Sequence, residues 1–359
     1  MTEFGKIGVC GAGAMGSGIA QVAAQSGHPV VVYDVFAPSR EKSEALIGKS
    51  LDQLVSRGKL DAEKAAAVRA NLVWTDDVTL LADCDLVVEA IIEDIAAKQS
   101  LFAQLEEHMQ PHAVIASNTS SLSIARLAGG LKRPERFVGM HFFNPATVMK
   151  LVEVVSGPAT PRTVADAIAQ LARSWGKVAV PVADVPGFIV NRVARPFYAE
   201  GFRCVQQGGA APELVDLLFR SAAGFRMGPL ELTDLIGQDV NFAVARSVYE
   251  SYFGQTRFIP QLPQVALVDA NWLGRKTGRG VYDYAEGKEP AAPGTSDGAA
   301  LANAPQRPGV VSASLAEIEV EGVHIRISNG RTARSVAKEI GRDVVVIDWF
   351  DGASAKAAG

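Results

Sequence analysis

Short, continuously apolar runs recur along the first half of the chain, and longer segments with apolar residues at helical spacing separate them. Runs of this kind indicate buried strands, and the intervening periodicity indicates amphipathic helices. The predicted strands cover residues 4–10, 29–34, 85–90, 113–116, 137–140, 151–155 and 178–180. The predicted helices cover 14–26, much of 40–70, 95–109 and 161–174. Strands that alternate with helices predict an α/β fold, a mainly parallel sheet with helices on both faces.

The pattern changes after Asp184-Val185-Pro186-Gly187, where the strand signals give way to helical periodicity. The periodic segments are 187–207, 212–222, 229–236 and 238–253. Because strand signals are scarce among them, they predict a second domain that is all-α.

A polar, Gly- and Pro-rich stretch follows the helical segments at 286–312 and is typical of a linker. Beyond it, apolar and polar residues alternate up to the turn signal Asn329-Gly330, which predicts a hairpin. A short helix and a strand at 344–347 are predicted to follow. The chain is therefore predicted to have four parts: an α/β domain at 1–186, a helical domain at 187–285, a linker at 286–312 and a small α/β appendage at 313–359.

A glycine-rich turn, Gly11-Ala12-Gly13-Ala14-Met15-Gly16, joins the first predicted strand to the first predicted helix. In dinucleotide-binding folds the first glycine makes the tight turn, the second admits the pyrophosphate, and the third lets the helix pack on the strand. The helix N-terminus then offers N–H groups to the phosphates. Asp34 closes the second strand, about 20 residues later, where a carboxylate binds an adenosine ribose diol. Since this carboxylate would repel a 2′-phosphate, the pattern predicts a Rossmann-type domain that binds NAD.

Polar residues follow two later strands, at the edge of the sheet where parallel α/β folds bind ligands. Ser117-Asn118-Thr119-Ser120-Ser121 follows one strand, and the next delivers His141, which can exchange a proton near neutral pH. Glu153 lies inside an apolar run, so its carboxylate needs a partner such as an imidazole N–H. Asn191 opens the helical domain, where its amide can hydrogen-bond a substrate oxygen.

Each of these residues also has a structural interpretation. A histidine at a strand end is more often a satisfied structural residue than a catalytic one. Glu153 fits an exposed strand face, and Ser120 fits a helix N-cap.

Composition excludes several classes of function. The formal net charge of −4 is spread along the chain, which argues against nucleic acid, and no apolar run is long enough to cross a bilayer. The three cysteines are isolated, so they predict neither disulfides nor a metal knuckle and favour a reducing cytoplasm. Pro111 interrupts the helix between His108 and His112, so we expect no metal site there.

The motifs together resemble the 3-hydroxyacyl-CoA dehydrogenase family, with the short bacterial 3-hydroxybutyryl-CoA dehydrogenases as the nearest type. The resemblance covers about residues 4 to 285. It is carried by the glycine turn, Glu89-Ala90-Ile91-Ile92-Glu93, Ser117–Ser121, His141-Phe142-Phe143-Asn144-Pro145, Pro186-Gly187-Phe188-Ile189-Val190-Asn191-Arg192, Gly228-Pro229, Asp234-Leu235-Ile236-Gly237 and Lys276-Thr277-Gly278-Arg279-Gly280.

The resemblance implies a set of site residues. His141 would be the catalytic base, Glu153 its orienting partner, and Ser120 and Asn191 would position the substrate's C3 oxygen. The implied NAD-contacting positions are Gly11, Gly13, Ala14, Met15, Gly16, Asp34, Glu93, Lys98, Asn118, Ser120, Asn144 and Lys276. The implied contacts to the CoA substrate are Ser50, Arg57 and Ser120, with Arg57 standing where the family often has a lysine.

The tail resembles the connecting segment of a longer subgroup that is associated with phenylacetate breakdown and 3-hydroxyadipyl-CoA. That subgroup has a second helical domain after the segment, whereas this chain stops before one, either as a piece of a longer enzyme or as a natural short form.

The prediction is an NAD-dependent (S)-3-hydroxyacyl-CoA dehydrogenase of fatty acid β-oxidation type, acting as a cytoplasmic homodimer. The dimer is expected because the predicted helices carry more apolar residues than one small helical layer can bury. Two alternatives remain at this point: a dehydrogenase of a free hydroxy acid without CoA, and an NAD-binding protein without catalysis.

Overall fold

The computed structural model describes residues 4–208 and 210–285, together with the backbone of three strands in the tail. The chain forms two compact units. The first comprises Met1–Ala194 with Glu250–Gly254, and the second comprises Arg195–Tyr249 with the chain from Gln255 onwards.

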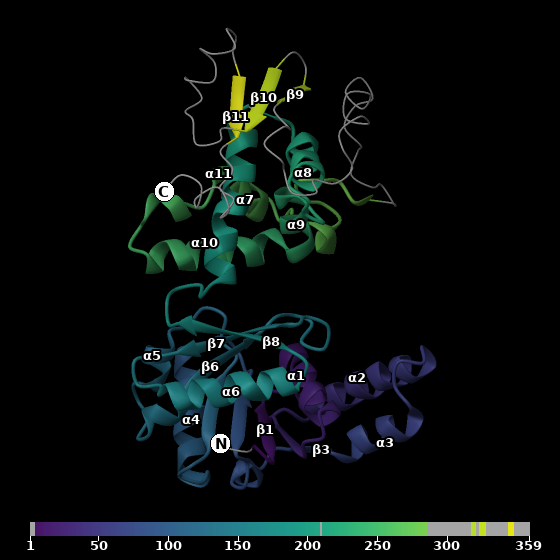
Figure 1. The fold of residues 1–359 in the computed structure, drawn as a ribbon, viewed down its shortest axis with the longest axis vertical. Helices are drawn as coiled ribbons and strands as arrows, with labels where there is room; N and C mark the ends of the chain where they lie inside the picture. The colour runs from purple at the N-terminus through teal and green to yellow at the C-terminus, as the bar shows by residue number, and fades with distance from the viewer. Residues whose placement is uncertain (1–3, 209, 286–316, 321–322, 328–343, 348–359) are drawn as a thin grey trace. The chain divides into compact units, whose positions relative to one another are not determined.

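The first unit is built on an eight-stranded sheet, drawn from purple to teal in Figure 1. Its strands are β1 (Ile7–Cys10), β2 (Val30–Tyr33), β3 (Leu72–Thr75), β4 (Leu86–Glu89), β5 (Val114–Ser117), β6 (Phe137–Phe142), β7 (Leu151–Ser156) and β8 (Val178–Ala183). The strand order is β3-β2-β1-β4-β5-β6-β7-β8, and every neighbouring pair is parallel except β6 and β7. This order confirms the predicted Rossmann-type, mainly parallel sheet.

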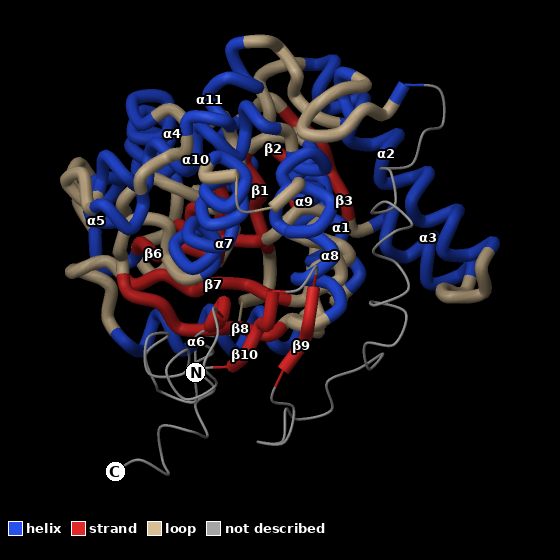
Figure 2. The backbone as a smooth tube through the Cα atoms, turned by 90° about the horizontal axis from the view of Figure 1, so that it is seen from above, coloured by secondary structure: helices blue, strands red, loops and turns tan. Residues whose placement is uncertain are grey.

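Helices cover both faces of this sheet because its strands are apolar on both sides. Val30 and Val32 face one core, which the helices α1 (Ala14–Gln25), α2 (Ala37–Ser56), α3 (Ala62–Ala70) and α6 (Arg162–Ser174) complete. Val31 faces a second core, which α4 (Ile95–His108) and α5 (Ile124–Ala128) complete. This alternation follows from the two-residue period of a strand. Figures 1 and 2 both place α2 and α3 beside β3 at one end of the sheet.

The structure contains elements that the sequence pattern did not predict. β3 pairs in parallel with β2, although its four residues carry neither a long apolar run nor an alternating pattern. α5 is a single helical turn, begun by Ser123, whose hydroxyl accepts from the backbone N–H of Arg126. Elements this short lack the sequence periodicity on which helix and strand predictions rest.

The second unit contains the predicted helices, as α7 (Val190–Gln206, which begins in the first unit), α8 (Pro212–Ser221), α9 (Pro229–Ile236) and α10 (Gln238–Ser251), and adds α11 (Leu262–Asp269). Its small core is built around Phe202, Val215, Leu230 and Tyr282. The buried carboxylate of Asp216 on α8 accepts hydrogen bonds from Leu230 N at 2.8 Å and from the hydroxyl of Tyr282 at 2.6 Å. One side chain thus joins α8, the start of α9 and the segment that contains Tyr282.

In the tail, β9 (Glu317–Val320) pairs antiparallel with β10 (Val323–Ile327), and β11 (Val344–Ile347) pairs parallel with β10. The predicted hairpin and final strand are therefore present, while the predicted short helix and the linker at 286–312 lie outside the described residues.

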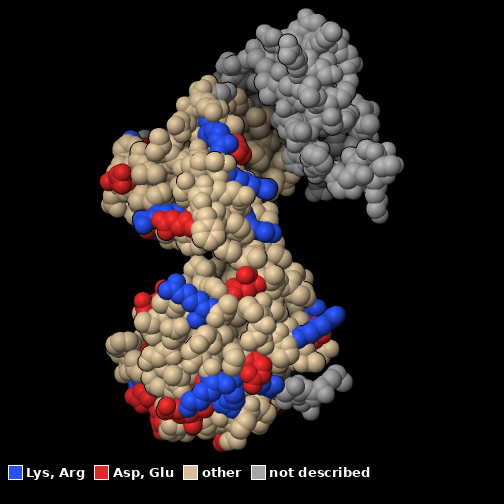
Figure 3. All heavy atoms as spheres, turned by 90° about the vertical axis from the view of Figure 1, so that its left-hand side faces the viewer, with Lys and Arg blue, Asp and Glu red and all other residues tan. Residues whose placement is uncertain are grey.

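The surface mixes charges of both signs. On the face drawn in Figure 3, basic and acidic side chains of the described residues lie next to one another over each unit. None of the helices in the described part of the chain combines the length and the apolar character that a bilayer crossing requires.

Candidate active site

The glycine turn between β1 and α1 has the form that a bound pyrophosphate requires. Gly11 has a φ of +101°, and a Cβ on it would lie 2.6 Å from the carbonyl oxygen of Ala90. A Cβ on Gly16 would lie 1.8 Å from the carbonyl oxygen of Gly11, so only glycine lets helix and strand approach this closely. A Cβ on Gly13, in contrast, would meet nothing within 4 Å, which leaves space beside the loop for a ligand.

The first turn of α1 faces that space with its backbone N–H groups. The N-cap residue Gly13 has no side chain with which to cap the helix, so the positive end of the helix dipole is available to an anion. The Asp34 carboxylate lies beside the loop, where it accepts from Ala12 N at 2.7 Å and from Phe36 N at 2.9 Å. The loop, the helix end and this carboxylate fit the pyrophosphate and ribose of a dinucleotide.

His141 and Glu153 form a buried pair across the one antiparallel junction of the sheet. The two residues are register partners on β6 and β7, and Nδ1 of His141 lies 2.7 Å from Oε2 of Glu153. His141 is 5% exposed and Glu153 is 1% exposed. A carboxylate accepts hydrogen bonds, so this network assigns the proton to Nδ1 and leaves Nε2 as the acceptor of the ring.

The second carboxylate oxygen of Glu153 hydrogen-bonds the backbone at the start of α7. Its Oε1 accepts from the backbone N–H groups of Ile189 and Val190, both at 3.0 Å. Burial alone would raise the pKa of Glu153, but the hydrogen bonds from His141, Val190 and Ile189 outweigh it and lower the pKa. Glu153 is therefore an ionised carboxylate at neutral pH, with both oxygens engaged.

Two aromatic rings lie close to the His141 imidazole. The Phe143 ring centroid lies 4.6 Å from that of His141, and the Phe188 centroid lies 5.8 Å from it. Phe188 is buried and has a φ of 48°, a left-handed conformation that is strained for a bulky side chain. Neither ring was predicted to line the site, although both lie in sequence motifs that the prediction used.

Ser120 and Asn191 come from distant parts of the chain and meet in the structure. The Asn191 amide nitrogen donates to the backbone carbonyl of Ser120 at 3.3 Å. Both residues that were predicted to handle the C3 oxygen therefore lie together in the first unit, as do His141 and Glu153.

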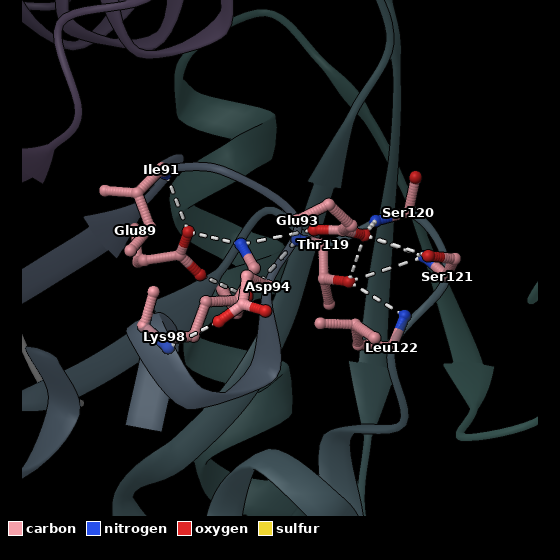
Figure 4. A network of polar contacts seen from close by, with 11 residues as sticks. Glu89, Ile91, Glu93, Asp94, Lys98, Thr119, Ser120, Ser121 and Leu122 are labelled. Atoms are coloured by element: carbon pink, nitrogen blue, oxygen red, sulfur yellow. Dashed lines mark hydrogen bonds and ion pairs between the residues drawn. The ribbon is translucent and has the colours of Figure 1, made fainter. Parts of the chain in front are cut away.

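A buried network fixes the loop that carries Ser120 (Figure 4). Glu89, at the end of β4, is fully buried and accepts from the Lys98 ammonium, from Ser117 Oγ at 2.6 Å and from Ile91 N at 2.7 Å. The Lys98 ammonium also pairs with Glu93 at 3.2 Å. The sequence prediction gave Glu89 no role. Lys98 is 1% exposed, which is unusual for a lysine.

Glu93 completes the network from the loop side. One of its oxygens accepts from Thr119 Oγ1 at 2.6 Å, from Ser120 N at 3.0 Å and from Ser121 Oγ at 3.0 Å. Burial raises the pKa of Glu93, but the hydrogen bond from Thr119 and the positive charge of Lys98 outweigh it and lower the pKa. The Glu93 carboxylate thus holds three consecutive residues of the loop, Thr119, Ser120 and Ser121, by hydrogen bonds.

The remaining predicted residues have individual surroundings. Asn118 Oδ1 accepts from Phe142 N at 2.8 Å, which joins the ends of β5 and β6. Asn144 is exposed and precedes Pro145, and Lys276 lies in the second unit, where it pairs with Asp239 at 2.6 Å.

Two of the three predicted CoA contacts, Ser50 and Arg57, lie on α2 or at its end. Ser50 Oγ accepts from the Gln21 amide of α1 at 3.0 Å. Arg57 is exposed and follows the last residue of the helix.

Comparison with known proteins assigns both units to one family. Residues 6–185 match the NAD binding domain of 3-hydroxyacyl-CoA dehydrogenase, and residues 187–284 match the C-terminal domain of 3-hydroxyacyl-CoA dehydrogenase.

Individual relatives agree with this assignment. The chain is 46% identical over 352 residues to the 3-hydroxyadipyl-CoA dehydrogenase of Escherichia coli K12, an alignment that covers 98% of this chain and 73% of that protein. It is 40% identical over 279 residues to the 3-hydroxybutyryl-CoA dehydrogenase of Clostridioides difficile, covering 78% of this chain and 99% of that protein. The crystal structure of a 3-hydroxybutyryl-CoA dehydrogenase from Escherichia coli K12 superposes with a TM-score of 0.84 at 44% identity, covering 98% of this chain and 73% of that one.

Proposed function

Because the chain belongs to the 3-hydroxyacyl-CoA dehydrogenase family and is an NAD-dependent enzyme, we propose that His141 is the general acid and base of its reaction and Glu153 its partner. The proposed reaction interconverts an (S)-3-hydroxyacyl-CoA and a 3-oxoacyl-CoA. The hydride that leaves C3 of the hydroxyacyl substrate would be taken up by the nicotinamide ring that bound NAD supplies.

The observation that carries the proposal is the buried His141–Glu153 pair. Since Nδ1 donates to Glu153, Nε2 is the nitrogen that can take the proton from the C3 hydroxyl. The imidazole becomes a cation at that moment, and the ionised carboxylate stabilises it while holding the ring in one tautomer. In the reverse direction the same nitrogen returns the proton to the oxygen of a 3-oxoacyl-CoA. Phe143 and Phe188 limit the access of water to the ring.

Ser120 and Asn191 are proposed to hydrogen-bond the C3 oxygen while its charge changes. Their mutual contact, together with the Glu93 and Glu89 network under the loop, supports a fixed position for these two groups. Preorganised donors of this kind need no rearrangement during the reaction.

NAD would be held by the glycine turn and by Asp34, which fit its pyrophosphate and ribose. Glu93, Lys98, Asn118 and Asn144 of the first unit are proposed as further positions around the cofactor, and Lys276 of the second unit remains a prediction from the family resemblance. For the CoA part of the substrate, we propose Ser50, Arg57 and Ser120.

The acyl group is proposed to be short, as in 3-hydroxybutyryl-CoA, or a dicarboxylic one, as in 3-hydroxyadipyl-CoA. Both candidates come from the names of relatives. The alignment with the 3-hydroxyadipyl-CoA enzyme extends over 98% of the chain and so includes residues of the tail, which favours the second candidate.

The experiment that tests the proposal compares substrates by NADH oxidation. We expect turnover of acetoacetyl-CoA and of 3-oxoadipyl-CoA, with no comparable turnover of free acetoacetate. Rapid oxidation of NADH with free acetoacetate would favour a hydroxy-acid dehydrogenase without CoA. NADH binding without turnover of any of the three substrates would favour a protein that only binds the nucleotide.

We also propose a homodimer formed by the second unit. Leu235, Ile236 and Val240 are 40% to 50% exposed on α9 and α10, and a symmetric partner is the commonest cover for such residues. Light scattering should give twice the chain mass, and a monomer at micromolar concentration would contradict the proposal. The free thiols of Cys10, Cys84 and Cys204 agree with a cytoplasmic location.

A further inference from the structure

Two acidic residues stand side by side where β2 and β3 end. The strands are parallel, with Tyr33 and Thr75 as register partners, and the backbone N–H of Asp34 donates to the carbonyl of Thr75 at 3.0 Å. Asp34 and Asp76 are therefore the residues that follow two paired strand ends. Asp34 is the proposed ribose ligand, so Asp76 lies on the side of the cofactor site where the adenosine is expected.

Arg40, in the first turns of α2, connects these two residues. Its Nη1 donates to the backbone carbonyl of Asp34, and its Nη2 pairs with the Asp76 carboxylate at 2.9 Å. The Arg40 side chain is 18% exposed, whereas the Asp76 side chain is 64% exposed. The guanidinium thus lies against the residue that carries the ribose carboxylate, and Asp76 holds it from the solvent side.

Three carboxylates, those of Asp34, Asp76 and Asp77, lie where β2 and β3 end. Burial raises the pKa of the Tyr33 hydroxyl, and the carboxylates of Asp34, Asp76 and Asp77 raise it further. Asp77 is occupied differently from Asp76, because it caps the next helical turn by accepting from Thr79 N at 2.9 Å. Of the two carboxylates that follow β3, Asp76 therefore forms the ion pair with Arg40 and Asp77 caps the helical turn.

We propose that Asp76 is a second determinant of cofactor selectivity, because it occupies Arg40 and so withholds a cation that would bind the 2′-phosphate of NADP. Arginine is well suited to that role, since its planar fork binds phosphate oxygens in a bidentate way. Asp34 excludes the 2′-phosphate by repulsion, and Asp76 excludes it by neutralising the neighbouring arginine. Removing Asp34 alone therefore leaves Arg40 engaged and yields only weak NADP binding.

The test measures binding of NADPH and NADH to the full chain by calorimetric titration, so it does not depend on the acyl substrate or on turnover. Four variants are compared: Asp34→Ser, Asp34→Ser with Asp76→Asn, Asp34→Ser with Asp77→Asn, and Asp34→Ser with both Asp76→Asn and Arg40→Gln. The Asp77→Asn change removes the same charge one residue away while leaving the Arg40 pair intact. Asn also retains the ability to cap the helical turn.

Adding Asp76→Asn to Asp34→Ser should tighten NADPH binding by about tenfold, the usual effect of one hydrogen bond to a charged group. The Asp77→Asn combination should tighten it by no more than about twofold, and Arg40→Gln should cancel the gain. NADH affinity should differ little among the four variants, which shows that the site has kept its structure. If Asp34→Ser abolishes NADH binding, the same series is built on Asp34→Asn. Equal gains from Asp76→Asn and Asp77→Asn, a gain that survives Arg40→Gln, or no gain at all would overturn the proposal.

Discussion

Glu89 and Glu153 are two carboxylates in one sheet, equally buried and differently partnered. Glu89 is fully buried and Glu153 is 1% exposed, and each accepts both backbone and side-chain hydrogen bonds. The partner of Glu89 is the Lys98 ammonium, whereas the partner of Glu153 is an imidazole. Burial alone therefore does not distinguish a scaffold charge from a charge that serves a reaction; the chemistry of the partner does.

The difference has a physical basis. The Lys98 ammonium is held by two carboxylates, Glu89 and Glu93, and takes no part in the proposed proton transfer, so the Glu89–Lys98 pair positions the loop attached to it. An imidazole exchanges its proton near neutral pH, so the Glu153–His141 pair can change charge during a reaction. We therefore expect changes at Lys98 to affect stability first and changes at His141 to affect turnover first.

The largest expected effect is on turnover, from His141→Ala. Loss of a positioned general base lowers kcat by about 10²- to 10⁴-fold, since the alanine side chain cannot take the C3 proton. NADH affinity should change little, whereas the free energy of unfolding should fall, because the buried Glu153 carboxylate loses its hydrogen bond from the imidazole. Steady-state kinetics with saturating acetoacetyl-CoA measure the effect, and a kcat within about tenfold of the wild type would remove His141 from the mechanism.

Lys98→Met should instead lower the free energy of unfolding. Removing one member of a buried ion pair leaves the other charge without compensation, at a cost of about 3–5 kcal/mol. Denaturant titration measures the loss. The matched control is Lys64→Met, because Lys64 and its partner Asp61 are both 73% exposed, and such solvent-screened pairs contribute little to stability. Equal losses in the two variants would contradict the assignment of the Glu89–Lys98 pair as a scaffold.

Glu153→Gln should lower kcat by roughly 10- to 100-fold, which is the loss of one hydrogen bond to a charged group expressed as a rate. The amide keeps the shape of the carboxylate but does not stabilise an imidazolium. Glu107→Gln, on the exposed end of α4, is the control and should leave kcat unchanged. An unaltered rate and pH–rate profile in Glu153→Gln would show that the carboxylate serves the fold alone.

Much of this fold and site could be predicted from patterns that are local in the sequence. The glycine turn and Asp34 lie within one strand–helix–strand unit. Their separation along the chain is therefore enough to predict that they lie close together in the fold. Glu153 stood out as a charge in an apolar run, and its contact with an imidazole, suggested on that ground, is present in the structure.

What escaped prediction depends on contacts between distant segments. Lys98 was predicted only as a position that contacts NAD, and its burial could not be predicted because it depends on the contact with Glu89 at the end of β4. The strand β3 is four residues long and is defined by its pairing with β2, so the position of Asp76 beside Asp34 could not be predicted. The left-handed backbone conformation of Phe188 could not be predicted from the sequence, because phenylalanine usually avoids this conformation.

The smallest expected effect is a pH dependence of stability, which tests the contrast between Glu153 and Glu89. The pKa of Glu153 is lowered in the folded protein, because the hydrogen bonds from His141, Val190 and Ile189 outweigh its burial, so the unfolded chain takes up a proton at this carboxyl before the folded protein does. Its stabilising contribution is therefore complete above the unfolded-state pKa of about 4.3 and is lost as the pH falls through the folded-state pKa. Glu153→Gln should be less stable than the wild type by about 1–3 kcal/mol at pH 5.5, and this difference should shrink toward pH 3. The other carboxyl groups titrate in both proteins, so the difference between the two unfolding free energies reports on Glu153 together with its partner His141. A difference that stays constant between pH 5.5 and pH 3 would mean that Glu153 is not held as an anion, and the contrast with Glu89 would then lose its basis.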